Sequence, residues 1–277
     1  IIADVRARGD VALCELTAKF DRLDVDAAGL RFSEAEVDAA CASVSDKDRA
    51  ALEMAATRIK AYHARQLPED AMWTDDVGAQ LGWRWTPVSA AGLYVPGGLA
   101  TYPSSVLMNA IPAKVAGVAR LAMVVPTPDG VVNPLVLLAA RISGVDEIYR
   151  VGGAQAVAAL AYGTKTIRKV QKIVGPGGPY VTAAKKLVYG DVDLDMVAGP
   201  SEIAVLADES AFPSHVAADL ISQLEHGTGH EKALFVTPYM SLAKKVLAEM
   251  ERQIASLSRR EAIERAATAG AMFVVTD

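Results

Sequence analysis

Gln223 and His226 are the two residues whose types and spacing most directly suggest chemistry. They lie three positions apart at the end of a segment with helical periodicity, 212–226, and a glycine follows them. Side chains at that spacing share one face of a helix, and amide oxygen and imidazole nitrogen are donors that zinc accepts. The pair could supply half of a zinc site. A histidine in a last helical turn also interacts well with the free carbonyls there, so both interpretations stay open.

The other three histidines are weaker candidates for metal binding. His230 follows the pair, but two glycines interrupt the helix that would direct it, which favours a solvated loop residue. His215 lies near the start of the same helical segment, more than about ten ångströms along the axis from the pair. His63 lies among charged residues and is expected at the surface.

Glycine- and proline-rich stretches recur where strand-like segments give way to helical ones, at 92–98, 151–155, 174–180 and 197–202. Glycine lets backbone approach a ligand closely, proline stiffens the loop, and this edge of an open α/β sheet is where ligands bind. Helix N-termini there suit phosphate groups. No stretch is a Walker A or GxGxxG motif. Tight turns need the same residues, so nucleotide binding and plain turn chemistry both stay open.

Three side chains within these stretches could contact a ligand. Tyr94 and Gln155 offer an aromatic hydroxyl and an amide to a cofactor. Ser201 follows a Gly-Pro pair, where its hydroxyl could touch a substrate or cap the next element.

From residue 91, apolar strand-like segments alternate with amphipathic helical ones. Strands are predicted at 121–125, 147–151, 172–174, 203–207, 233–237 and 272–276. Helices are predicted at about 104–118, 133–143, 154–162, 179–189, 212–226, 241–256 and 260–269. Apolar strands separated by helices predict parallel βαβ units and a doubly wound α/β sheet.

The first part of the chain has a different pattern. Residues 1 to about 70 repeat apolar side chains at helical spacing, which predicts a helical lead-in. Around 73–88 short alternating stretches predict a hairpin or edge strands. We expect Trp73, Trp83 and Trp85 to pack in a core rather than to stack on a ligand.

Composition favours small-molecule chemistry. The 277 residues are 52% apolar and carry a net charge of -5 without a basic stripe, so neither nucleic acid nor an anionic membrane is an expected partner. Cys14 and Cys41 lie in helical stretches without metal-binding spacing, which predicts packing thiols in a reducing compartment.

No apolar run of about 18 residues and no leader is apparent, which predicts a cytoplasmic location. The sequence begins at Ile1 in a helical pattern and stops at Asp277 after a strand-like segment, and we expect it to be truncated at both ends.

Segment 94–117 resembles the histidinol dehydrogenase family. The likeness continues in order through 151–163, 172–177, 195–203 and 219–227, and so spans most of the chain. The resemblance implies a zinc- and NAD-dependent homodimer that oxidises a primary alcohol through an aldehyde to a carboxylate, with L-histidinol to L-histidine as the expected reaction. It assigns Gln223 and His226 to zinc and substrate, Tyr94, Gln155 and Gly178 to NAD, and Ser201 to substrate.

The resemblance also implies an architecture of two Rossmann-like doubly wound domains after the helical lead-in. Residues 94–202 would form one domain inserted in the chain. Residues 1–93 and 203–277 would form a discontinuous second α/β domain, incomplete at its C-terminal end.

Two departures from the family pattern bear on function. The family's Glu-His base pair and two further zinc ligands, Asp and His, would lie beyond Asp277, so the catalytic residues stay unknown. The family's asparagine after Gly-Pro-Gly is Gly178 here, followed by Pro179. Two alternatives therefore stay open: a paralogue that oxidises another small polyol such as sulfopropanediol, and a catalytically inactive nucleotide-binding α/β protein.

Overall fold

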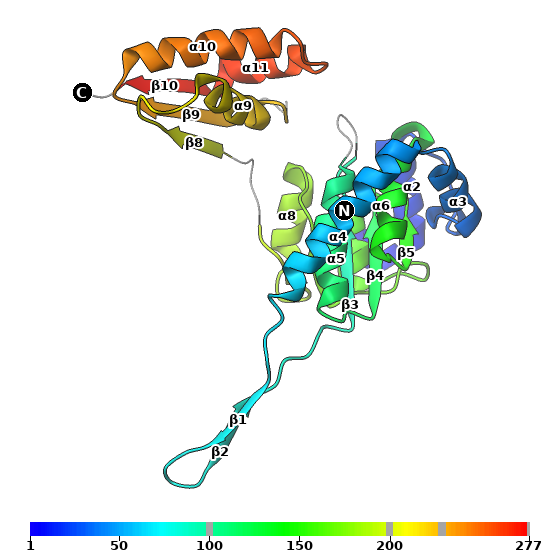
Figure 1. The fold of residues 1–277 in the computed structure, drawn as a ribbon. Helices are drawn as coiled ribbons and strands as arrows, with labels where there is room; N and C mark the ends of the chain where they lie inside the picture. The colour runs from blue at the N-terminus through cyan, green and yellow to red at the C-terminus, as the bar shows by residue number, and fades with distance from the viewer. Residues whose placement is uncertain (98–101, 198–201, 227–230, 276–277) are drawn as a thin grey trace. The chain divides into compact units, whose positions relative to one another are not determined.

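The computed structural model describes residues 1–97, 102–197, 202–226 and 231–275. The chain divides into two compact units, residues 1–197 and residues 198–277. Each unit contains a parallel β-sheet of its own (Figure 1). Parallel strands joined by helices are what the alternating sequence pattern predicts, and the predicted α/β class with a helical start is confirmed.

The first unit is built on a five-stranded parallel sheet with the order β5-β4-β3-β6-β7. Its strands are β3 (Ala90–Tyr94), β4 (Arg120–Val124), β5 (Glu147–Tyr149), β6 (Lys172–Val174) and β7 (Asp193–Leu194). Helices α5 (Pro103–Val115), α6 (Pro134–Ser143), α7 (Gly153–Tyr162) and α8 (Pro179–Val188) connect them. The strand order reverses between β3 and β6, so the carboxyl ends of these two strands form the switch point at which such sheets bind ligands.

In the described residues, the predicted helical lead-in consists of four α-helices, α1 (Ile2–Arg8), α2 (Asp10–Asp21), α3 (Glu34–Ala42) and α4 (Asp46–Ala64), and a short 3-10 helix, η1 (Ala28–Leu30). A capping box begins α3, because Ser33 Oγ accepts from the Glu36 backbone N–H at 3.3 Å and a Glu36 carboxylate oxygen accepts from the Ser33 N–H at 2.8 Å. Cys14 and Cys41 are partly buried free thiols that pack against the two cores of this unit, so their predicted packing role is confirmed.

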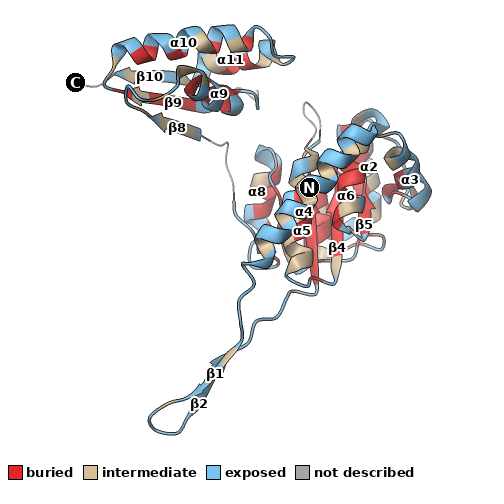
Figure 2. Cartoon of the chain, in the orientation of Figure 1, coloured by how far each residue is buried: buried red, intermediate tan, exposed pale blue. Residues whose placement is uncertain are grey.

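Both faces of the five-stranded sheet are covered. Successive residues of a strand point to opposite faces: Ala90 and Tyr94 of β3 join a core with α1, α2, α7 and α8, whereas Ala91 and Leu93 join a second core with α3, α5 and α6. Figure 2 shows these strands buried and the outer helix faces exposed. The first unit therefore has the doubly wound arrangement that the sequence predicts.

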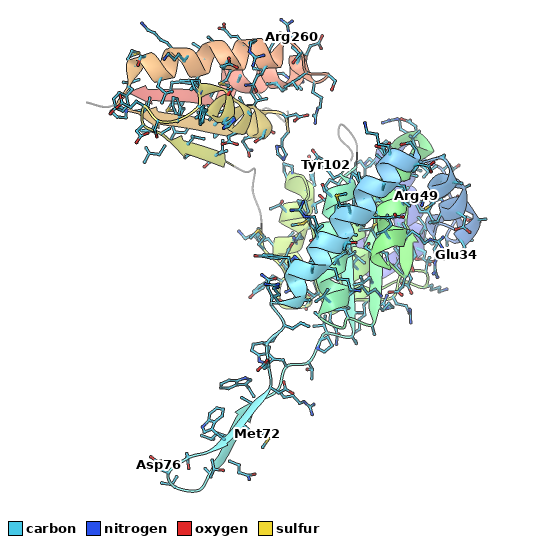
Figure 3. The ribbon with its side chains drawn as sticks, in the orientation of Figure 1. Glu34, Arg49, Met72, Asp76, Tyr102 and Arg260 are labelled. Atoms are coloured by element: carbon cyan, nitrogen blue, oxygen red, sulfur yellow. The ribbon has the colours of Figure 1, made fainter. Side chains whose placement is uncertain are left out.

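The segment before β3 contains an antiparallel hairpin, β1 (Ala71–Thr74) and β2 (Gln80–Trp83), as predicted. The prediction that its tryptophans lie in a core is wrong: Trp73, Trp83 and Trp85 are 44%, 53% and 61% exposed. The Trp73 and Trp83 rings contact each other edge to face, with centroids 5.0 Å apart. A two-stranded hairpin by itself cannot bury its side chains, because it needs a further element packed on one face. Met72 on the same hairpin is also largely exposed (Figure 3).

The second unit has a three-stranded parallel sheet, β8 (Glu202–Leu206), β9 (Lys232–Thr237) and β10 (Ala271–Val275), with β9 in the centre. Its helices are α9 (Pro213–Leu224), α10 (Met240–Ile254) and α11 (Arg260–Gly270). All three helices share one core with Ala233 and Phe235 of β9. None of the helices in the described part of the chain is long and apolar enough to cross a lipid bilayer.

In the described residues, the lead-in helices pack on the five-stranded sheet and belong to the unit of residues 1–197. The grouping of residues 1–93 with residues 203–277 in one discontinuous domain, beside an inserted domain of residues 94–202, stays a prediction.

Glu147 at the start of β5 is a buried carboxylate held by two arginines. It accepts from Arg120 Nη1 at 3.0 Å and from Arg168 Nη2 at 2.6 Å. Burial by itself raises the pKa of this carboxyl, but the two guanidinium groups outweigh it and hold the pKa below its usual value. A lowered folded-state pKa means that ionised Glu147 stabilises the fold above the unfolded-state value and that this contribution is lost as pH falls.

We expect Glu147→Gln to lower the free energy of unfolding by about 2 kcal/mol at neutral pH, because two charge-assisted hydrogen bonds are weakened. The difference between wild type and variant should shrink as pH falls below about 4.3, the ordinary value for glutamate. Urea unfolding followed by circular dichroism at a series of pH values measures it. A stability difference that does not vary with pH would contradict the assignment.

Candidate active site

The loop that follows β6 touches the end of β3 at the switch point. Leu93 and Val174 are register partners, so both strands end at the same edge. Gly175 then lies against the Tyr94 carbonyl, and a Cβ built on it would stand 2.1 Å from that oxygen. Its φ of +116° is also one that other residues rarely adopt. Only glycine fits this position, which explains one of the Gly-Pro stretches by backbone contact.

Lys185 and Asp195 hold the Gly175 peptide from both sides. Lys185, on α8, is 2% exposed, and its Nζ donates to the Gly175 carbonyl at 3.0 Å and forms an ion pair with Asp195. The other Asp195 carboxylate oxygen accepts from the Gly175 N–H at 2.8 Å. The loop after β6 is therefore fixed through both backbone groups of one residue before α8 begins.

The structure brings Tyr94 and Gln155 to the same turn. Tyr94 ends β3 and is 4% exposed, and its phenolic oxygen accepts from the Gly153 N–H at 3.1 Å. Gly153 has a φ of +63° and begins α7. Gln155 is 1% exposed, and its Oε1 lies 2.7 Å from the place that a Cβ on Gly153 would take. The two side chains that the sequence singles out thus flank the N-terminus of one helix.

Burial raises the pKa of Tyr94 to about 12. The hydrogen bond from Gly153 opposes this shift and the negative charge of Asp21 adds to it. The phenol therefore stays protonated through the neutral range, and its O–H can donate while its oxygen accepts.

Gly178 is the N-cap of α8, on the loop after β6, and it has an ordinary φ of −68°. No atom lies within 4 Å of a Cβ built at this position. The space and backbone conformation would therefore accept the asparagine that the family resemblance leads one to expect. Ser201, the predicted substrate contact, lies outside the described residues.

Gln223 and His226 lie together at the end of α9 in the second unit. Gln223 is buried, whereas His226 is exposed, and its Nδ1 lies 3.1 Å from the Gln223 carbonyl oxygen. When Nδ1 carries the proton and donates to that carbonyl, Nε2 presents its lone pair outward. This is the carbonyl-oriented arrangement that metal-binding histidines commonly have. The capping and metal-binding interpretations are thus compatible.

The described residues supply at most two members of this metal site. Among them no cluster of three or more His, Cys, Asp and Glu side chains could hold a metal. His215 is exposed, and its ring lies 5.3 Å from that of Phe212. His63 Nδ1 lies 2.6 Å from Gln66 Oε1 in α4, and His230 lies outside the described residues. Neither of the other described histidines, His63 and His215, therefore belongs to a metal-binding cluster among these residues.

Two hollows of the first unit lie away from the switch point. One of about 380 Å³ is lined by residues of α4, α5 and α6, and another of about 300 Å³ is lined by residues around α3 and the end of α6. Neither includes Tyr94, Gln155 or Gly178. The candidate site is instead recognised by its backbone turns and converging polar groups.

Sequence reasoning did not single out Lys185 and Asp195. A signal for Lys185 was present, because it shares the apolar face of α8 with Val181, Ala184 and Val188. A lysine on such a face needs a buried partner. Asp195, ten positions away, gave no comparable signal.

A family model described as histidinol dehydrogenase matches residues 1–277. The chain belongs to the histidinol dehydrogenase family. It is 63% identical to the histidinol dehydrogenase of Cereibacter sphaeroides, over 99% of this chain and 61% of that protein. It is 62% identical to that of Ruegeria pomeroyi, over 94% of this chain and 60% of that protein. The chain thus spans about three fifths of the length of these curated relatives.

A solved structure of the same family has the same fold. The histidinol dehydrogenase of Elizabethkingia anophelis superposes with a TM-score of 0.93 at 37% identity, covering 100% of this chain and 64% of that one. The parallel sheets and the helices described above are therefore those of the family.

We expect Gly175→Ala to lower the free energy of unfolding by about 2–4 kcal/mol, because the new Cβ meets the Tyr94 carbonyl and the backbone conformation becomes strained. Gly178→Asn is the matched control in the same loop and should stay within about 0.5 kcal/mol of wild type. Chemical denaturation of both variants measures this, and equal stabilities would contradict the close backbone contact.

Proposed function

We propose that the protein containing this chain oxidises L-histidinol to L-histidine, with NAD as the hydride acceptor and zinc as its metal. The observation that carries the proposal is the family match across the whole chain, at 63% identity to a histidinol dehydrogenase. The same family resemblance supports a homodimer located in the cytoplasm.

In this proposal NAD binds at the switch point of the first unit. The N-termini of α7 and α8 begin at this edge, and their free N–H groups and positive dipole ends suit a diphosphate. Tyr94 and Gln155 orient the cofactor from the Gly153 turn, and Gly178 contacts it through its backbone. When bound, NAD supplies the acceptor for the hydride that leaves the substrate carbon.

Gln223 and His226 hold zinc in the second unit through the amide oxygen and Nε2, and with Ser201 they also contact the substrate. When bound, zinc polarises the alcohol oxygen and eases loss of its proton. The exposed position of His226 and the orientation of its ring by the Gln223 carbonyl support this assignment.

The reaction takes place in two oxidations. In the first, the alcohol loses a proton from oxygen and a hydride from carbon, which leaves an aldehyde. In the second, water would add to the aldehyde, and the hydrate would lose another hydride and two protons to become a carboxylate. Each hydride reduces one NAD. The residues of this chain bind and orient the reactants, and no general base is assigned among them.

The full-length protein should contain zinc and form NADH when L-histidinol is added. Bound zinc without turnover of histidinol would favour a family member that oxidises another small polyol, such as sulfopropanediol. Absence of both zinc and NADH formation would favour a nucleotide-binding protein that lacks this catalysis.

Loss of an outer-sphere partner weakens metal binding roughly 10–100-fold. We expect His226→Ala and Gln223→Ala, which remove direct ligands, to weaken zinc binding by at least this much. Alcohol oxidation should fall with it while circular dichroism stays unchanged, because both residues lie at the end of α9. His215→Ala, near the start of the same helix, is the control. Metal analysis that finds full zinc content in both variants would reject the ligand assignment.

We expect Gly178→Asn to lower the KM for NAD about two- to tenfold, the value of one added hydrogen bond. The open space around position 178 accommodates the new side chain without displacing a neighbour. Steady-state kinetics with NAD as the varied substrate measures it. An unchanged KM would place the cofactor away from this loop.

A further inference from the structure

The C-terminal end of α2 carries a buried acid next to the candidate cofactor site. Asp21 is the last residue of α2 and is 7% exposed. The next residue, Arg22, has a left-handed φ of 53° and forms a two-point ion pair with Asp129, at 2.7 and 2.5 Å. This exposed pair joins the end of α2 to the loop after β4 but contributes little stability. Because of that turn, Asp21 enters the interior while Arg22 stays outside.

In the described residues, Asp21 is one of four buried side chains with a polar atom that lacks a hydrogen-bond partner, together with Thr17, Thr127 and Arg150. Its carboxylate accepts from the Thr127 backbone N–H. Among the described residues, however, Asp21 Oδ2, Thr17 Oγ1 and Thr127 Oγ1 have no hydrogen-bond partner, and all three atoms are shielded from solvent. Thr17 lies one turn before Asp21 on the same face of α2. Buried groups of this kind are normally satisfied by protein or by ordered water.

The Tyr94 hydroxyl can donate a hydrogen bond to an acceptor of this kind. Its oxygen already accepts from the Gly153 N–H, so the phenolic O–H is the atom that still needs an acceptor. Asp21 adjoins the same turn, because its partner Thr127 follows Pro126, and Pro126 lies against Gly152, the residue before Gly153. Tyr94 also shares a core with residues of α2 and α7. The site therefore has one donor, one carboxylate acceptor and two hydroxyls that can do either.

We propose that Asp21 is a positioning residue for Tyr94: one buried water, bound by Asp21 Oδ2 and by the Thr17 and Thr127 hydroxyls, accepts the phenolic proton. A buried water needs about two to four polar partners, and these groups provide them. The link holds the Tyr94 oxygen as the acceptor for Gly153 and so fixes the first turn of α7. Its consequence for NAD binding rests on the function proposed above.

The first test is spectroscopic and needs no cofactor. A phenol that donates into a carboxylate-anchored hydrogen bond absorbs at longer wavelength than one that has lost this partner. Asp21→Asn should therefore shift the Tyr94 part of the near-ultraviolet spectrum to shorter wavelength at neutral pH. The Tyr94 part is obtained by repeating the comparison in a Tyr94→Phe background, where the shift should vanish. Asp129→Asn, which breaks only the exposed ion pair, should leave the spectrum unchanged.

The second test is kinetic and uses the full-length enzyme. Asp21→Asn should raise the KM for NAD about five- to tenfold, a cost near that of one hydrogen bond. The kcat and the KM for histidinol should stay within about twofold of wild type. Tyr94→Phe should raise the KM for NAD similarly, and the double variant should be no worse than the single ones. Thr17→Val should have a smaller effect in the same direction, and Thr17→Ser should restore wild-type behaviour.

The outcomes separate the two proposals. Additive effects of Asp21→Asn and Tyr94→Phe on the KM for NAD, or a tyrosine spectrum that Asp21→Asn leaves unchanged, would overturn the positioning role. A shifted spectrum with an unchanged KM for NAD in both variants would support the contact between Asp21 and Tyr94 and count against the cofactor placement. If Asp21→Asn does not fold, Thr17→Val supplies the same comparison.

Discussion

The close approach of Gly175 to the Tyr94 carbonyl is the constraint on which the candidate cofactor site depends. It brings the ends of β3 and β6 together at the one place where the strand order of the five-stranded sheet reverses. The buried Lys185 and its partner Asp195 keep the Gly175 peptide there. Tyr94, fixed through its backbone on one side, reaches the start of α7 with its hydroxyl on the other. Two helix N-termini are thereby presented at one edge of the sheet.

The metal half of the proposed chemistry is built on a different principle. Gln223 lies in the last turn of α9 and His226 in the turn that follows, and the imidazole is oriented by the Gln223 carbonyl. Arg259 also donates to the His226 carbonyl at 3.3 Å, so one long-range contact supports this mostly local arrangement. The cofactor turn, in contrast, depends on contacts between residues up to about 80 positions apart, such as Gly175 with Tyr94.

Much of the fold could be predicted from the sequence, because apolar periodicity marks helices and buried strands directly. The predicted strand at 172–174 coincides with β6, and the predicted helices agree with α5 to α11 within a few residues. β7 was missed because a strand of two residues is too short to show a hydrophobic periodicity. β3 was missed because Ala90, Ala91 and Gly92 lack the branched side chains typical of strands. The tryptophans were assigned to a core because a pattern of apolar residues does not say whether another layer covers them. Tyr94 and Gln155 were found as polar side chains of the Gly-Pro stretches and were assigned to NAD by family resemblance. Lys185 left a signal on the apolar face of α8, whereas its partner Asp195 and the environment of Asp21 become visible only when the tertiary contacts are known.

The exposed hairpin has a consequence for studying this protein in solution. All three tryptophans of the chain, Trp73, Trp83 and Trp85, lie on or beside it, and each is at least 44% exposed. Indole emission from the chain will therefore be red-shifted in the native state and open to collisional quenchers such as iodide. It will report on anything that covers the hairpin, including a second subunit. The emission will change little when either parallel sheet unfolds.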